Sequence, residues 1–233
     1  MHGREKELLL HEELLLIALR DEKGAIHYQA GMCQYALAAA ILAELLLAER
    51  IAVEDDKKRI VNVTNTRPIG EPLLDECLSR IESARRRQRL RAWVQRLANT
   101  RQLRQRIAAG LCQRGILRED EDRVLWLFRR KLFPQRDPRH ERRIIERLRR
   151  AIFTETRSVA PRTAILIALA NGSGLLRIPF DKRELRGRKE RLTRITEGQL
   201  LGRAMHDAIK AVQAAIVAAS TVASTTAVTA ACT

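Results

Sequence analysis

Residues 34–53 read QYALAAAILAELLLAERIAV, and the first fifteen of these positions contain a single charged residue, Glu44. An α-helix of this composition is apolar around nearly its whole circumference, whereas a helix on a protein surface keeps one polar face. Such a helix is stable only where other elements cover it on all sides. The stretch therefore predicts the central helix of a bundle.

Two further segments are similarly poor in charge. Pro161 to Ala170 is nearly all apolar, and Ala211 to Ser220 is rich in alanine. Buried helices need amphipathic neighbours, so we predict a mainly α, single-domain helical bundle around buried apolar helices. Residues 211–233 have no charge but consist mainly of Ala, Ser and Thr, which disfavours a membrane span. We expect residues 1–220 to form the domain and residues 221–233 a tail rich in Ala, Ser and Thr.

Basic amphipathic helices surround these apolar segments in the sequence. Apolar residues recur there at helical spacing with charged residues between them. The predicted amphipathic segments are Glu5–Leu19, Leu73–Leu97 as one or two helices, Arg101–Arg114 and Arg139–Ile152.

One short segment departs from the helical period and predicts a protruding β-hairpin. Residues 124–128 read VLWLF, and Pro134 and Pro138 follow them. Short apolar and aromatic runs bounded by charge and proline are typical of strands. The apolar tip consists of Leu125, Trp126, Leu127 and Phe128. Its composition suits an anchor at a membrane interface, a contact between subunits, or a cover for the bundle.

The chain is strongly basic: 44 Lys and Arg residues stand against 28 Asp and Glu, a formal net charge of +16. Such a surface attracts polyanions, of which nucleic acid and acidic lipid headgroups are the main classes. Most of the cations are arginine, whose planar guanidinium matches phosphate in two-point geometry. Phosphate is therefore the expected anionic group, and charge alone does not choose its source.

The sequence contains no signature of catalysis or metal binding. The histidines lack the short spacings that place two imidazoles on one helix face, and no phosphate loop or nucleophile elbow occurs. His11, Glu12 and Glu13 are expected on a solvated helix face. We expect no enzyme, no metal and no cofactor. The cysteines are widely spaced and the first twenty residues are too charged for a signal peptide, which favours reduced thiols and a cytoplasmic location.

The order of the segments resembles the Golgi phosphoprotein 3 family along nearly the whole chain. Residues 14–24 (LLLIALRDEKG) and the apolar helix after them resemble the opening of that family. Residues 71–78 (EPLLDECL) are similar to its Leu-Leu-Asp-Glu-x-Leu helix start, and residues 101–117 to its Arg-x-x-Arg helix ending in Gly-Val-Leu. Residues 124–128 fall at its apolar hairpin and residues 164–169 at its buried Leu-rich helix.

This resemblance implies a peripheral membrane adaptor that recognises phosphatidylinositol 4-phosphate and captures the cytoplasmic tails of membrane proteins. Its partners would be an anionic phospholipid surface, such tails, and a second copy of the chain, because the family hairpin serves self-association. Two arginines of the family's phosphate pocket match Arg101 and Arg104, which we expect on one helix face.

Two other pocket positions of the family differ in this chain. The pocket tryptophan falls at Gln29 and a helix arginine at Ala38. Tyr28 and His27, next to Gln29, are candidates to supply the missing aromatic ring and cation. The predicted headgroup-binding residues are therefore Arg101, Arg104, Tyr28 and Gln29.

Two alternatives remain open from the residues. A nucleic-acid-binding basic helical protein is favoured by the arginines within residues 85–91 and 142–150, but aromatic residues for base stacking make up only 3% of the chain. A purely structural bundle whose arginines reflect composition is the other.

Overall fold

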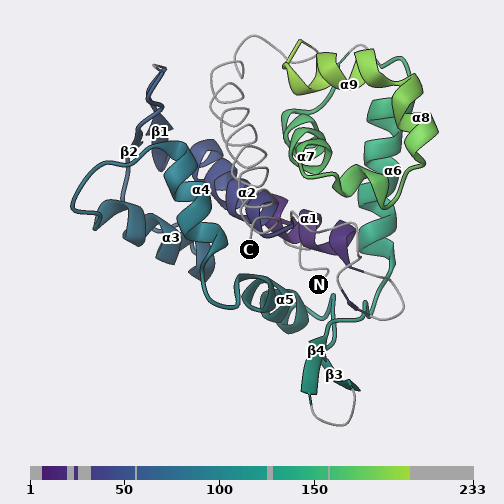
Figure 1. Cartoon of the computed structure of the whole chain (residues 1–233), viewed down its shortest axis with the longest axis horizontal. Coiled ribbons are helices and arrows are strands. Elements are labelled where there is room, and N and C mark those ends of the chain that lie inside the picture. Colours follow the sequence, from purple (N-terminus) through teal and green to yellow (C-terminus); the bar gives the residue numbers. More distant parts are fainter. Residues whose placement is uncertain are drawn as a thin grey trace, which may run out of the picture.

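The computed structural model describes residues 7–19, 24–25, 33–55, 57–124, 128–156 and 158–199. Within these ranges the chain is mainly helical, as predicted, with two small two-stranded sheets (Figure 1). The helices are α1 (Leu10–Ala18), α2 (Cys33–Leu47), α3 (Pro72–Glu82), α4 (Leu90–Ala98), α5 (Leu103–Gln113), α6 (Arg139–Phe153), α7 (Pro161–Gly172), α8 (Lys182–Gly187) and α9 (Lys189–Thr196), with a 3-10 helix η1 (Leu175–Arg177). The strands are β1 (Ile51–Val53), β2 (Val61–Val63), β3 (Asp120–Val124) and β4 (Phe128–Leu132).

The apolar segment of residues 34–53 contributes the central helix α2, which confirms that prediction. Residues 36–46 of α2 are all buried, and α1, α4 and α7 pack against this helix. The helix ends six residues earlier than predicted. Glu49 adopts a left-handed conformation with a φ of 54°, after which Ile51–Val53 form β1 against β2. This small sheet was not predicted from the sequence.

The hairpin prediction is confirmed. β3 and β4 are antiparallel, and Val124 pairs with Phe128, so that residues 125–127 connect the two strands. The side chain of Phe128 and residues Leu125, Trp126 and Leu127 lie outside the described part of the chain. Their roles as an anchor or a contact stay predictions.

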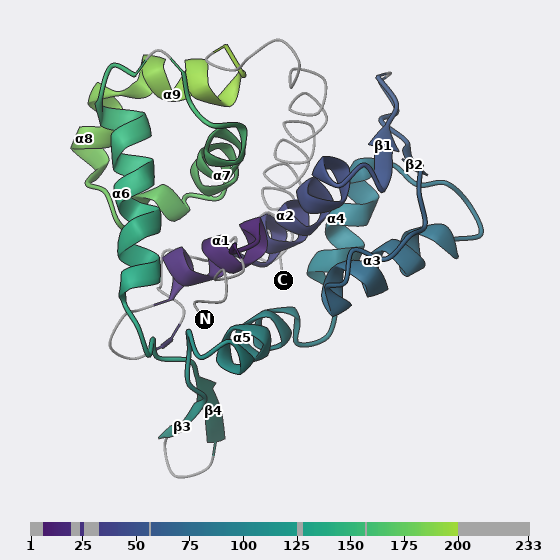
Figure 2. The ribbon, with the colours of Figure 1, turned by 180° about the vertical axis from the view of Figure 1, so that it is seen from behind.

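The second half of the chain forms a group of helices around α7 (Figure 2). α7 is buried from Thr163 to Ala170, and α6 turns Ile144, Leu148 and Ile152 inward, one helical turn apart. The predicted Ala211–Ser220 helix and the 221–233 tail lie outside the described residues. Within the described ranges, no helix combines the length and the apolar content that crossing a bilayer requires.

The first helix corrects one expectation. His11, Glu12 and Glu13 do not lie on a solvated face: they are 2%, 7% and 4% exposed. Glu12 accepts a hydrogen bond from Arg114 at 2.7 Å, and Glu13 accepts one from Arg147 at 2.6 Å. The expectation of a solvated face was wrong because the arginines that satisfy these carboxylates come from α6 and from just after α5, far along the chain.

Glu44 of α2 belongs to the same buried ionic network. Its carboxylate accepts hydrogen bonds from both terminal nitrogens of Arg162, at 2.9 and 3.1 Å, and from the backbone N–H of Leu10 at 2.6 Å. The single charge of the central helix thus connects α2 to the starts of α1 and α7. Burial, and to a smaller extent the charge of Arg162, lower the pKa of the neighbouring His11 to about 3.

Candidate functional site: a basic cluster at the start of α5

The start of α5 is open to solvent and positively polarised. The chain leaves α4 in a tight turn, with the N–H of Leu103 donating to the carbonyl of Thr100 at 3.2 Å, and Gln102 has a φ of 56°. No side chain in the described part of the structure caps this helix. The free N–H groups of a helix start, together with the helix dipole, favour an anion at this position.

Arg101 and Arg104 flank this helix start. They do not share a helix face, contrary to the prediction, because Arg101 precedes the helix and the left-handed Gln102 separates the two. Arg101 is exposed and Arg104 is partly buried, and neither forms an ion pair with a described carboxylate. The structure therefore brings both arginines to one helix start by a turn rather than by helical periodicity.

Arg104 also lies close to the first residue of α2. Burial raises the pKa of the Cys33 thiol to about 12, and the nearby charge of Arg104 works against that increase. Gln29 precedes Cys33 by four positions in the sequence, but Tyr28 and Gln29 lie outside the described residues. Their approach to the arginines stays a prediction.

The position that matches the family's helix arginine is occupied by Ala38, which is completely buried in α2. A third cation comes instead from α3, where Arg80 donates a hydrogen bond to the Thr100 hydroxyl at 2.8 Å. Arg80 was not predicted from the sequence, because nothing in the arginine pattern of residues 73–97 sets it apart. We call Arg80, Arg101 and Arg104 the α5 cluster.

Another neighbouring arginine is already neutralised. Arg106 donates two hydrogen bonds to the carboxylate of Glu76. The hydrogen bond from Arg106 is the main reason that the pKa of Glu76 is lowered. Unlike Arg106, the three arginines of the α5 cluster form no ion pair with a carboxylate of the described residues.

The hairpin leaves the molecule near the other end of α5. With 11 residues, α5 is about 16 Å long, and Figures 1 and 2 place it at the same end of the molecule as β3 and β4. At the hairpin base the carbonyl of Gly24 accepts a hydrogen bond from Phe133 at 2.9 Å. Gly24 has a φ of +58°, and a Cβ there would overlap the backbone of Phe133 and Pro134. The segment containing Tyr28 thus begins at the hairpin base and ends at Cys33, next to Arg104.

The two arginine runs that favoured nucleic acid are partly engaged within the protein. Arg87 pairs with Glu54 at 3.1 Å. On α6, Arg147 bonds Glu13, Arg150 bonds Glu146, and the guanidinium of Arg149 lies over the rings of Phe153 and Phe180. These contacts reduce the number of guanidinium groups that are available to a phosphate backbone.

In the described ranges, no three His, Cys, Asp or Glu side chains gather as a metal site would require. Cys77 is buried like Cys33, and burial raises the pKa of its thiol to about 12. Buried thiols with a raised pKa are poor nucleophiles.

Comparison with known proteins gives a family match and two informative relatives. The family model for Golgi phosphoprotein 3 (GPP34) matches residues 10–212. The vacuolar protein sorting-associated protein 74 of Eremothecium gossypii is 33% identical over 136 residues, which cover 50% of this chain and 41% of that protein. The protein of the same name from Schizosaccharomyces pombe is 29% identical over 143 residues, which cover 52% of this chain and 42% of that protein. The chain thus matches less than half the length of these curated relatives.

Proposed function

Because this chain belongs to the Golgi phosphoprotein 3 (GPP34) family, a non-enzymatic adaptor family, we propose that it is a peripheral membrane adaptor. It binds the phosphate of an anionic lipid headgroup at the α5 cluster. The observation that carries the proposal is three arginines that form no ion pair with any carboxylate of the described residues, around a helix start that no described side chain caps.

The chemistry of the cluster suits a phosphate monoester. Guanidinium groups present two parallel donors to phosphate oxygens, and the open N–H groups at the helix start add donors of fixed direction. A hydrogen bond to a charged group contributes about 1.5 to 3 kcal/mol. Two such contacts are therefore sufficient to distinguish a phosphorylated headgroup from an uncharged one.

The proposed headgroup is phosphatidylinositol 4-phosphate, as the family implies. Gln29 and Ala38 stand where the family has a tryptophan and an arginine, and losing one charged contact costs about tenfold or more in affinity. Arg80 replaces the missing cation from α3 in this proposal, because its hydrogen bond to Thr100 holds it beside Arg101.

The hairpin and the protein partners complete the proposed role. The apolar tip at residues 125–128 contacts either the membrane interface or a second copy of the chain, and the adaptor captures cytoplasmic tails of membrane proteins. These functions follow from family membership and the composition of the hairpin.

Vesicle co-sedimentation tests the headgroup site. The vesicles are phosphatidylcholine alone, or phosphatidylcholine with either phosphatidylinositol 4-phosphate or phosphatidylserine. The site variant is Arg101→Gln/Arg104→Gln. Its matched control, Arg183→Gln/Arg194→Gln, removes the same charge from exposed positions on α8 and α9. We expect the wild type and the control to prefer phosphatidylinositol 4-phosphate, and the site variant to bind it at least tenfold more weakly.

Equal binding of all three proteins to both kinds of acidic vesicle, abolished by salt, would contradict the proposal. Diffuse surface charge produces that result, because added salt screens exposed charges over about 10 Å at 0.1 M. An Arg80→Gln variant extends the test, since the proposal expects it to lose affinity although the residue lies on a different helix.

A further inference from the structure

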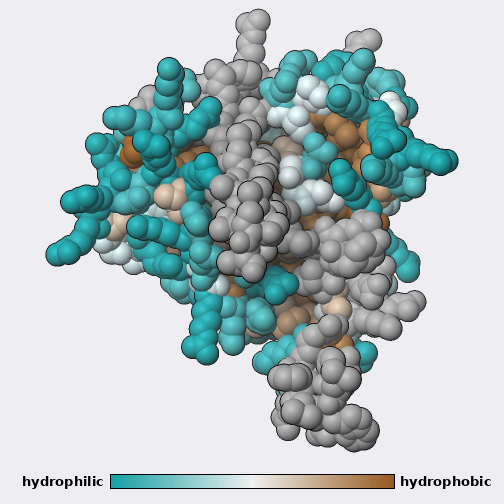
Figure 3. All heavy atoms as spheres, in the orientation of Figure 1, coloured by the Kyte–Doolittle hydropathy of each residue, from teal (hydrophilic) through white to brown (hydrophobic). Residues whose placement is uncertain are grey.

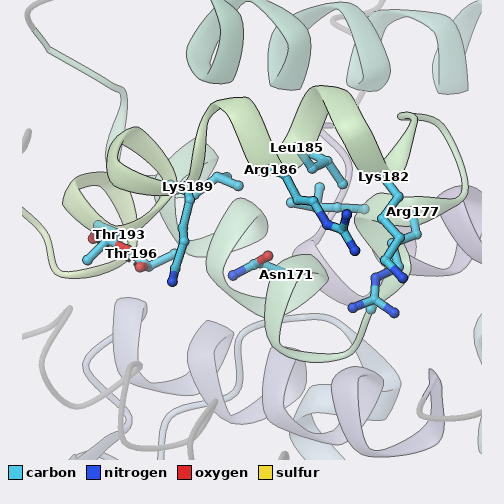
Figure 4. Close-up of a pocket in the computed structure, with 11 residues that line it drawn as sticks. Asn171, Arg177, Lys182, Leu185, Arg186, Lys189, Thr193 and Thr196 are labelled. Atoms are coloured by element: carbon cyan, nitrogen blue, oxygen red, sulfur yellow. Dashed lines mark hydrogen bonds between the residues drawn. The ribbon is translucent and has the colours of Figure 1, made fainter.

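A second basic hollow lies between α7, η1, α8 and α9 (Figure 4), at the end of the molecule opposite α5 in Figures 1 and 2. Its volume is about 340 Å³. Binding sites for small molecules are typically concave spaces of about 300 to 1,000 Å³. The hollow is thus large enough for a small ligand and is separate from the α5 cluster.

Four cations from three elements converge on this hollow. They are Arg177 of η1, Lys182 and Arg186 of α8, and Lys189 of α9. In Figure 4, Arg177, Lys182 and Arg186 lie on one side of Asn171 and Lys189 on the other. None of the described residues that line the hollow is acidic, and none of the four cations has an ion-pair partner in the described part of the chain.

Three acidic residues of this region, Asp181, Glu184 and Glu155, have other partners. Asp181 and Glu184 form the capping box at the start of α8. Glu155 pairs with Arg188 at 2.8 Å, and Arg188 does not line the hollow. Arg188 and Arg191 thus pair with Glu155, whereas the four cations that line the hollow, like Arg183 and Arg194 outside it, form no ion pair with a described carboxylate. Converging like charges repel each other, and an anion placed among them removes that repulsion.

The lining is not only charged. Leu176, Leu185 and Leu192 contribute apolar surface, while Thr193 and Thr196 contribute polar groups near Lys189. Figure 3 shows brown apolar surface surrounded by hydrophilic side chains in the region that α7 to α9 occupy in Figure 1. An apolar floor with a few converging polar groups is typical of a ligand site, whereas a solvated patch of basic residues lacks the floor.

We propose that this hollow is a second anion site, which binds a phosphate group carried on a partly apolar molecule. The guanidinium groups of Arg177 and Arg186 bind phosphate oxygens in two-point geometry, and the two lysines add compact charges. The leucines contact the carbon part of the ligand. This inference does not depend on the function proposed for α5.

Binding is measured with a background protein that carries Arg101→Gln/Arg104→Gln, so that the α5 cluster does not contribute to the signal. The probes are glycerol 3-phosphate by titration calorimetry, and phosphatidylcholine vesicles with and without phosphatidic acid by co-sedimentation. The test variant adds Arg186→Gln/Lys189→Gln. The matched control adds Arg183→Gln/Arg194→Gln, which removes the same charge from α8 and α9 outside the hollow. All four positions are exposed, so both variants should fold, and thermal unfolding verifies this.

We expect the background protein to bind at least one probe saturably, the test variant to bind it at least tenfold more weakly, and the control to change less than twofold. Binding of phosphatidic acid vesicles alone identifies a lipid headgroup as the source of the phosphate, and binding of glycerol 3-phosphate identifies a water-soluble ester. Equal weakening in test and control, or no saturable binding of either probe, would overturn the proposal.

Discussion

Arginines gather in two regions of this molecule, and they pair with carboxylates in one region but not in the other. Next to α1, the guanidinium groups of Arg114, Arg147 and Arg162 donate hydrogen bonds to buried carboxylates. The nitrogen–oxygen distances lie between 2.6 and 3.1 Å. In the hollow between α7 and α9, Arg177 and Arg186 point at no carboxylate in the described chain. The first region uses arginine to hold helices together, and the second leaves its charge available.

The difference shows why composition alone could not assign a role to these arginines. A net charge of +16 does not distinguish arginines that are paired with carboxylates from arginines whose charge is available to a ligand. Once the acidic partners of the first kind are identified, the described cations without an ion pair include the α5 cluster and the four that line the α7–α9 hollow. The two kinds of arginine should therefore respond differently to substitution.

The largest expected effect is at Arg162. An Arg162→Leu variant leaves the carboxylate of Glu44, whose side chain is 6% exposed, with the Leu10 N–H as its one remaining donor among the described residues. Removing one partner of a buried ion pair costs about 3 to 5 kcal/mol of unfolding free energy, measured by urea denaturation. The double variant Glu44→Gln/Arg162→Leu removes the charge and should recover part of the loss. A loss below about 1 kcal/mol for the single variant would show that this buried ion pair contributes no more to stability than an exposed ion pair does.

A smaller effect is expected at Arg147, and it sharpens the comparison within the network. Its partner Glu13 is as buried as Glu44, but the arginine side chain is 39% exposed, against 31% for Arg162. Arg147→Leu should cost about 1.5 to 2 kcal/mol, because a hydrogen bond to a charged group is lost while water reaches the site.

The cost at Arg147 should also depend on pH. Burial raises the pKa of Glu13 and Arg147 opposes that increase, so the substitution raises this pKa further. The loss should be full at neutral pH and should shrink as pH falls through the folded-state pKa, because a protonated Glu13 needs no cation. Urea denaturation at several pH values measures this, and a loss independent of pH would contradict the assignment.

Substitution of His11 should change how the unfolding free energy depends on pH, rather than lower it by a fixed amount. Its pKa falls from 6.5 to about 3 in the folded protein, so between these values the unfolded chain binds a proton that the folded protein does not. Stability should therefore rise with pH across this window, by at most about 1.4 kcal/mol per unit for one group. His11→Gln should flatten the slope of unfolding free energy against pH by up to this amount. An unchanged slope would show that His11 is protonated in the folded state.

The smallest effects are expected where arginines have no partner. Arg104→Gln and Arg186→Gln should change the unfolding free energy by less than about 0.5 kcal/mol, as surface substitutions usually do. The measurement is the same urea denaturation, with Arg162→Leu as the reference. A loss above about 1 kcal/mol at either position would place that residue among the structural arginines.

Most of the fold was predictable from the sequence because its helices follow from the pattern of apolar and charged residues within each segment. The composition of α2 and α7, and the helical spacing in α3 to α6, depend on neighbouring residues alone. The β1–β2 sheet was missed because three-residue strands carry too little pattern, and because the left-handed Glu49 that ends α2 has no sequence signature.

The sites were less predictable because they depend on residues that are distant in sequence. Arg101 and Arg104 were identified through resemblance, but the left-handed turn between them was not. Arg80 reaches the cluster only because α3 packs beside the turn at Thr100. The burial of Glu12 and Glu13 could not be inferred from α1, since acidic residues in a first helical turn are ordinarily exposed.

The ionic network under α1 also constrains the order of events during synthesis. The three pairs connect residues 102, 134 and 118 positions apart, and a chain emerges from the ribosome with its N-terminus first. α1 therefore appears with its acidic residues unmatched and its leucines uncovered. The third pair cannot close before Arg162 has emerged. Contacts between residues so distant in sequence slow folding. The nascent α1–α2 pair therefore exposes its apolar surface through most of translation. Molecular chaperones would act on this surface during that interval.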